Sequence, residues 1–189
     1  STDIKNATTL ASRTPPCLIA MGIRYYAFAF DADMTEQAIA NPRRFLSPDP
    51  LGDAWGIAHT EAGDIATFQQ ALPEEEMLYL DKAWPLLQEL TKAPPGCPAR
   101  AAYQMFEGEV HPWAGPYEPW VCTHTPEQVV AISLDLDTIT EDEIRGHLAD
   151  RDHPADEAGV ASAIAYFQKA RTFANCLASS GRGFVHMIG

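Results

Sequence analysis

Cys122 and His124 are the residues whose types and spacing most directly suggest chemistry. They stand two positions apart, so on a β-strand both side chains would point to the same face. With His111 they could ligate a metal, or Cys122 could act as a nucleophile with a histidine base. No third ligand has the spacing of a metal-binding motif, and free cysteine is among the most frequently buried residue types. We therefore expect a buried cysteine beside a histidine that precedes a helix, with no metal and no cofactor.

Asp81 and Lys82 form a second candidate pair. They could act as acid and base, or hold an anion at the N-terminus of a helix. Pro85 is tolerated only in the first turn of a helix, so it predicts that the helix begins at Asp81 or just after. Asp81 is then a helix cap worth about 1 kcal/mol, and Trp84 is a core residue. Lys82 has no structural task in this interpretation and stays a candidate binding residue.

Three large aromatic residues, Trp113, Tyr117 and Trp120, lie with His111 in a proline-rich segment. Tryptophan and tyrosine dominate the energetics of protein interfaces, so an exposed loop of this kind would be an interaction patch. The same residues could instead fold back as a lid on the core. Both interpretations remain open from the sequence.

Composition limits the classes of function. The chain has 189 residues, 46% of them hydrophobic, which suits one domain with an ample core. No stretch reaches the roughly 18 apolar residues of a membrane span, and the first 20 residues lack a signal-peptide core, so we expect a cytoplasmic protein that does not bind membranes. The net charge of −13 argues against nucleic-acid binding. The four widely spaced cysteines are expected to be reduced thiols.

The acidic residues are concentrated in one part of the chain. Residues 127–157 contain ten acids and only two bases, Arg145 and Arg151, which gives −8 of the total −13. Solvated helical faces of this kind are common and keep proteins soluble. The alternative is an acidic surface that attracts a basic protein partner.

Periodicity predicts strands at both ends and in the middle of the chain. Residues 23–30 form an apolar strand with both faces buried, and further strands are expected at 77–80, 101–106, 120–124 and 184–188. Helices are expected at 33–40, 65–72, 81–93, 126–136, 141–150 and 155–179, with a long loop at 42–63.

Local signals set several helix ends. Asp33, Thr125 and Thr140 each begin a capping box, and Gly181 ends the last helix. The expected fold class is α/β (α+β), a layered sandwich in which a small mixed β-sheet is flanked by helices. An all-helical bundle is the alternative.

Four features together resemble a known family, the YfbM-like proteins, which are bacterial proteins of unknown function. They are Met21-Gly22 before an aromatic strand, Leu80-Asp81-Lys82-Ala83-Trp84 followed by Leu87, Thr125-Pro126-Glu127-Gln128-Val129, and Tyr166-Phe167 in the last helix. The resemblance covers residues 21–189 and implies one cytoplasmic, layered α/β domain, with residues 1–20 as an N-terminal extension. It implies no established activity and so no catalytic residue. The chain departs from the family pattern at Pro85, in that extension, and at His153-Pro154, where a tyrosine-proline pair is usual.

Two hypotheses for function follow. We favour a non-enzymatic binding or regulatory domain, in one version an inhibitor or immunity-type protein that covers a basic partner. The alternative is a small hydrolase or ligand-binding enzyme with its site at the sheet edge, which requires Tyr25, Asp81, Lys82, His111 and His124 to converge on one pocket.

Overall fold

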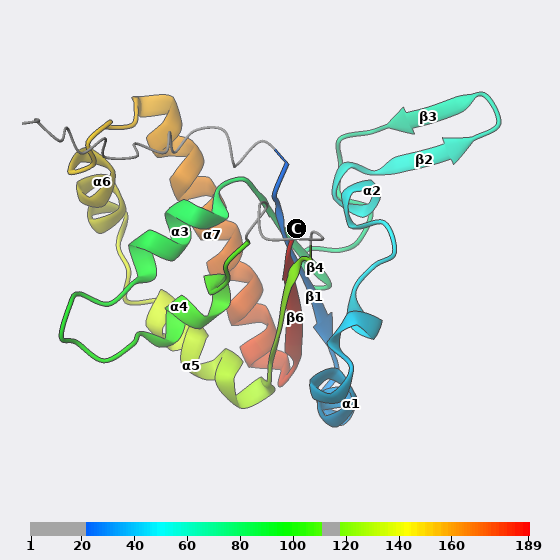
Figure 1. The fold of residues 1–189 in the computed structure, drawn as a ribbon, viewed down its shortest axis with the longest axis horizontal. Coiled ribbons are helices and arrows are strands. Elements are labelled where there is room, and N and C mark those ends of the chain that lie inside the picture. The colour runs from blue at the N-terminus through cyan, green and yellow to red at the C-terminus, as the bar shows by residue number, and fades with distance from the viewer. Residues whose placement is uncertain (1–21, 111–117) are drawn as a thin grey trace, which may run out of the picture.

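A four-stranded antiparallel sheet forms the centre of the protein. The computed structural model describes residues 22–110 and 118–189. The sheet contains β1 (Tyr25–Phe30), β4 (Met77–Asp81), β5 (Trp120–His124) and β6 (Gly183–Ile188) in the order β4-β1-β6-β5. The first and last of these strands are neighbours, paired from Tyr25 with Ile188 to Phe30 with Gly183. The two ends of the described chain therefore meet in the middle of the sheet (Figure 1).

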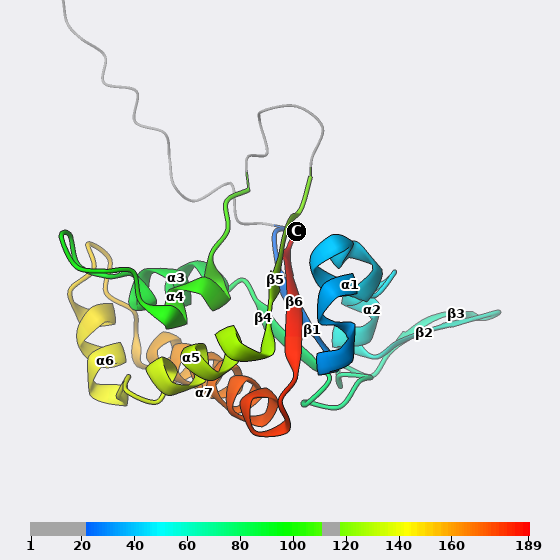
Figure 2. The ribbon, with the colours of Figure 1, turned by 90° about the horizontal axis from the view of Figure 1, so that it is seen from below.

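Helices cover both faces of the sheet. They are α1 (Thr35–Ala40), α2 (Pro50–Trp55), α3 (Trp84–Thr91), α4 (Ala101–Phe106), α5 (Pro126–Leu136), α6 (Glu141–Ala149) and α7 (Glu157–Ser180), with 3₁₀ turns at Ala32–Met34 and Pro42–Phe45. Figure 2 shows α3 to α7 on one side of the sheet and α1 and α2 on the other. A two-stranded hairpin of β2 (Ile57–Thr60) and β3 (Gly63–Ala66) projects away from the body. The α+β layered class predicted from the sequence is confirmed.

The main core lies between the sheet and α7. On β1, Tyr25 and Ala27 face this core, whereas Tyr26 and Phe28 face the smaller core against α2, which explains why both faces of the strand are apolar. α7 packs on the sheet through buried residues at helical spacing: Val160, Ala163, Phe167, Ala170, Phe173, Ala174 and Leu177.

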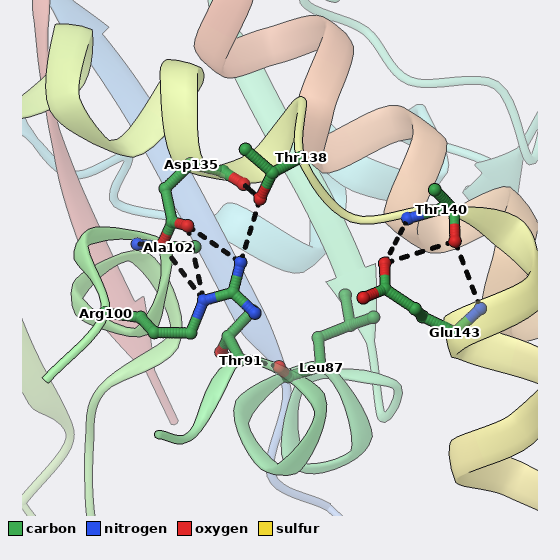
Figure 3. Close-up of polar contacts among 8 residues, drawn as sticks. All are labelled: Leu87, Thr91, Arg100, Ala102, Asp135, Thr138, Thr140 and Glu143. Carbon is green, nitrogen blue, oxygen red and sulfur yellow. Dashed lines mark hydrogen bonds and ion pairs between the residues drawn. The ribbon is translucent and has the colours of Figure 1, made fainter. Parts of the chain in front are cut away.

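Several predicted helix ends are confirmed at the atomic level. Thr125 and Thr140 both form complete capping boxes, with Gln128 and Glu143 as the reciprocal partners; the Thr140 box is drawn in Figure 3. Gly181 ends α7 in the left-handed conformation, with φ of 65°.

Two predictions from the sequence were wrong: the mixed sheet and the strand at residues 101–106. Every strand pair among the described residues is antiparallel, so the sheet that they form is not mixed. Residues 101–106, predicted as a strand, form α4, which buries Ala102, Met105 and Phe106. Those positions are spaced as on a helix face, and a short apolar run does not distinguish the two periods.

The segment between α1 and β4 is also more structured than expected. The predicted loop at 42–63 contains a 3₁₀ turn, α2 and β2, and the predicted helix at 65–72 begins as β3. Asp33 lies inside a 3₁₀ turn and caps nothing, whereas Asp49, which the prediction overlooked, caps α2 by accepting from the N–H of Gly52. The Asp49-Pro50 pair is the sequence signal for the start of α2, because proline is favoured at the first position of a helix.

Asp81 has a different task from the predicted one. It ends β4 with φ of 48°, and α3 begins only at Trp84, without a side-chain cap. Pro85 does lie in the first turn, as predicted. The carboxylate of Asp81 instead accepts from Nε of Arg24 at 3.0 Å, which joins β4 to the residue before β1.

Cys97, Cys122 and Cys176 are free thiols, as expected, and Cys17 lies outside the described residues. The predicted extension at residues 1–20 also lies outside them, so the division into an extension and one domain stays a prediction. Within the described parts of the chain, no helix has the length and apolarity needed to cross a membrane.

Candidate functional site

Cys122, His124 and His186 form a cluster on the face of the sheet that α3 to α7 cover. Cys122 is paired with His186 across β5 and β6, and His124 lies two residues further along β5, so all three side chains share one face. One potential ligand atom from each residue lies within 4.8 Å of the others. His186 is fully buried, His124 nearly so, and Cys122 is half-buried.

The hydrogen bonds define the tautomers of the two histidines. His186 Nε2 lies 2.9 Å from the carbonyl oxygen of Glu107, which can only accept, so this nitrogen carries the proton. His186 Nδ1 must then accept from His124 Nε2, which is 2.9 Å away. His124 Nδ1 is left with a buried lone pair that has no hydrogen-bond partner among the described residues.

Aromatic packing fixes the orientation of the imidazole rings. The Tyr25 ring stacks on His186 with centroids 5.2 Å apart and 17° between the planes. The Tyr25 hydroxyl donates to the carbonyl of Met105 at 2.8 Å, and the Phe184 ring lies 4.5 Å from that of His124. The rings therefore have little freedom to rotate away from each other.

Burial controls the protonation of the cluster. It lowers the pKa of His186 to about 4 and lowers the pKa of His124 well below its ordinary value, with a further contribution from the charge of His186. Burial, with the negative charge of Glu107, raises the pKa of the Cys122 thiol. At neutral pH the histidines are neutral and the thiol is protonated, which is unfavourable for a nucleophilic thiolate. Neutral imidazole, however, is the form that binds metals.

The predicted site residues fall into two groups. Tyr25 and His124 meet around His186, and Trp120 lies on the same face of β5, against the backbone of Gly108. Lys82 lies at the opposite edge of the sheet in a shallow pocket lined by residues of β4, α3 and α7. β4 and β5 are three strand spacings apart, about 14 Å.

The enzyme hypothesis needed these groups to converge. Among the described residues, Asp81 and Lys82 do not share a pocket with Tyr25 and His124. His111, Trp113 and Tyr117 lie outside the described residues, so their proposed roles stay predictions.

His186 is the member of the cluster that the sequence prediction missed. It is the only polar residue within the strand sequence Phe184-Val185-His186-Met187-Ile188, and its alternation with Phe184 and Ile188 places it on the core face. A histidine on the buried face of a strand is a usable signal, but its partner His124 is 62 residues away.

A second feature is a groove between α5 and α7. It has a volume of about 390 Å³ and contains Val130 and Leu134, whose exposed fractions are 43% and 66%. Glu127, Val130, Leu134 and Asp137 follow one another at spacings of three or four residues, so they share one face of α5. An exposed apolar pair is thus placed between two carboxylates.

The surroundings of this groove are acidic. Of the ten acids in residues 127–157, all except Asp135 are exposed. Asp135 is held by Nε and Nη2 of Arg100 and by the N–H of Ala102, while Thr138 also accepts from Arg100 (Figure 3). This ion pair joins α5 to the start of α4, so the helix that carries the groove is firmly placed.

The comparisons with known proteins define the fold but not the function. No protein-family model and no curated protein sequence matches the chain. The structure is similar to that of YfbM from Escherichia coli, a protein of unknown function, with a TM-score of 0.51 and 12% sequence identity. The similarity covers 88% of this chain and 99% of that one. The resemblance to YfbM-like proteins expected from the sequence is thereby confirmed at the level of the fold.

Proposed function

We propose that the protein is a cytoplasmic, non-enzymatic binding domain that docks a basic, amphipathic segment of another protein in the groove between α5 and α7. The observation that supports this most is the exposed pair Val130 and Leu134 within an acidic surface. An apolar side chain of the partner would occupy the groove, and its lysine or arginine residues would face Glu127 and Asp137. This is the helix-in-groove mode of recognition.

The negative charge of the protein also favours a basic partner. Residues 127–157 contribute −8, and the chain as a whole carries −13. Fields of this sign accelerate the approach of basic proteins and repel acidic ones. An inhibitor or immunity-type role, in which these helices cover the basic surface of a toxin or nuclease, is one form of this proposal.

Leu134→Ser should weaken binding to a basic partner by about 10-fold, because it removes the most exposed apolar contact of the groove. The probe is a labelled 14-residue helical peptide with leucines four residues apart and lysines on the flanking positions, titrated by fluorescence anisotropy. Ile39→Ser is the matched control, since Ile39 is 58% exposed but lies on α1, on the other side of the sheet.

The dependence of binding on salt concentration distinguishes the electrostatic contribution from the apolar contact in the groove. Raising the ionic strength from about 0.05 to 0.5 M should weaken binding of the wild type and of Leu134→Ser in parallel. The proposal is wrong if Leu134→Ser and Ile39→Ser bind equally, or if a peptide with glutamates in place of the lysines binds as tightly.

A further inference from the structure

We propose that Cys122, His124 and His186 form a Zn²⁺ site with three protein ligands, the fourth position being open to water. This inference is independent of the groove between α5 and α7. It differs from the expectation, drawn from the sequence, that the cysteine and histidine bind no metal.

The donor set suits zinc. One thiolate and two imidazoles are ligands that zinc accepts in both structural and catalytic sites, whereas Mg²⁺ and Ca²⁺ prefer oxygen. In the part of the chain that the structure describes, this is the group of histidine, cysteine and carboxylate side chains whose donor atoms converge closely enough for an ion.

The donor atoms are close to the spacing of a zinc site, but the two imidazoles must adjust to share an ion. Tetrahedral zinc places two nitrogen ligands about 3.3 Å apart and a nitrogen and a sulfur about 3.6 Å apart. The two imidazole nitrogens are now 2.9 Å apart, and the three donor atoms lie within 4.8 Å of one another. The nitrogens must separate by a few tenths of an ångström and turn their lone pairs from each other toward a shared ion, and the Cys122 sulfur must move closer to them.

His186 already has the outer partner of a metal ligand. Metal-binding histidines almost always donate their other N–H to a carboxylate or a backbone carbonyl, which sets the tautomer. His186 Nε2 donates to the carbonyl of Glu107, and so its Nδ1 carries the lone pair inside the cluster. The stacked Tyr25 ring holds the imidazole in this orientation.

The ion would replace the proton that now lies between the two imidazoles. His124 shifts its single proton from Nε2 to Nδ1, a buried atom that has no hydrogen-bond partner among the described residues, and stays neutral. Cys122 loses its thiol proton to solvent, so binding releases one proton. Among the described strands β5 lies at the edge of the sheet, and Cys122 is half-buried, so in the described part of the chain the cluster is reached from the sheet edge. The bound ion would join β5 to the last strand, β6.

The experiment titrates the full chain, first stripped with a chelator, with Zn²⁺ by calorimetry and with Co²⁺ by absorption. We expect about one ion per chain and a thiolate-to-cobalt charge-transfer band in the near ultraviolet. Cys122→Ser should abolish that band and weaken Zn²⁺ binding by at least about 10-fold, which is the loss caused by removing even an outer partner of a ligand.

Two controls distinguish this site from others on the surface. The double variant Cys97→Ser with Cys176→Ser removes the other described thiols, both exposed, and should leave the band and the affinity unchanged. His59→Ala removes the exposed histidine that contacts Asp49 and Asp64, and it should also have no effect.

Thermal unfolding provides a second readout that does not depend on the cobalt band. Zn²⁺ should raise the Tm of the wild type and of both controls by more than that of Cys122→Ser, whose fold is checked by circular dichroism. The proposal is overturned if Cys122→Ser binds Zn²⁺ as tightly as the wild type, or if the wild type binds none.

Discussion

Phe184→Ala should lower the free energy of unfolding by about 3–5 kcal/mol, the largest loss that we expect from a single substitution. Phe184 is fully buried in β6. The centroid of its ring lies 4.5 Å from that of His124 and 5.7 Å from that of Phe173 of α7, which it meets edge-on. Its removal leaves a cavity between the sheet and its longest helix. Since a whole domain is stable by only about 5–15 kcal/mol, this is a large share of the total.

Urea-induced unfolding followed by circular dichroism measures this loss. Phe68→Ala is the matched control, because Phe68 is 75% exposed and its ring pairs with Trp55 at a centroid distance of 6.0 Å, so its removal should cost no more than about 1.5 kcal/mol. Similar losses for the two variants would show that the core does not lie between β6 and α7.

Asp135→Asn should cost about 2–3 kcal/mol. The change leaves the guanidinium of Arg100, which is 29% exposed, without its counter-ion, and it weakens the bond to the N–H of Ala102. The loss is smaller than for a fully buried pair because water reaches part of the site. Asp152→Asn is the control: Asp152 is exposed and should contribute less than about 0.5 kcal/mol.

The contribution of Asp135 should depend on pH in a defined direction. Partial burial acts to raise the pKa of Asp135, but hydrogen bonds from Arg100 and from the Ala102 N–H outweigh it, so the pKa lies below its ordinary value. The stabilisation is therefore complete above the unfolded pKa, about 3.9, and is lost as the pH falls through the folded value.

The difference in unfolding free energy between the wild type and Asp135→Asn should thus be constant from about pH 6 to 8 and shrink below about pH 4. Urea unfolding at each pH measures it. A difference that grows on acidification would contradict the assignment of this ion pair.

The sequence predicted two of the three residues of the cysteine–histidine cluster. Cys122 and His124 were recognised because two positions on a strand share a face, and the strand itself is confirmed as β5. Their third partner could not be found by spacing, because His186 comes from the last strand and meets them only through the pairing of β5 with β6. Trp120 was placed on the correct strand, whereas the roles of Trp113 and Tyr117 stay predictions.

Local signals in the sequence determined the helix ends. Thr125 and Thr140 cap α5 and α6, and Gly181 ends α7, because each interaction is completed within a few residues along the chain. Pro85 likewise set the first turn of α3, since its ring and missing N–H depend on the backbone alone.

Tertiary structure decided what depends on distant partners. Asp81 has the residue type of a helix cap but binds Arg24, 57 residues earlier, and α4 is a helix because its apolar residues pack on the core. The sequence by itself determined the elements whose interactions are local, and the order of strands and the cysteine–histidine cluster were decided by the tertiary structure. The physical reason is that pairing of β6 with both β1 and β5 requires contacts between residues that are distant in sequence, and no local pattern encodes such contacts.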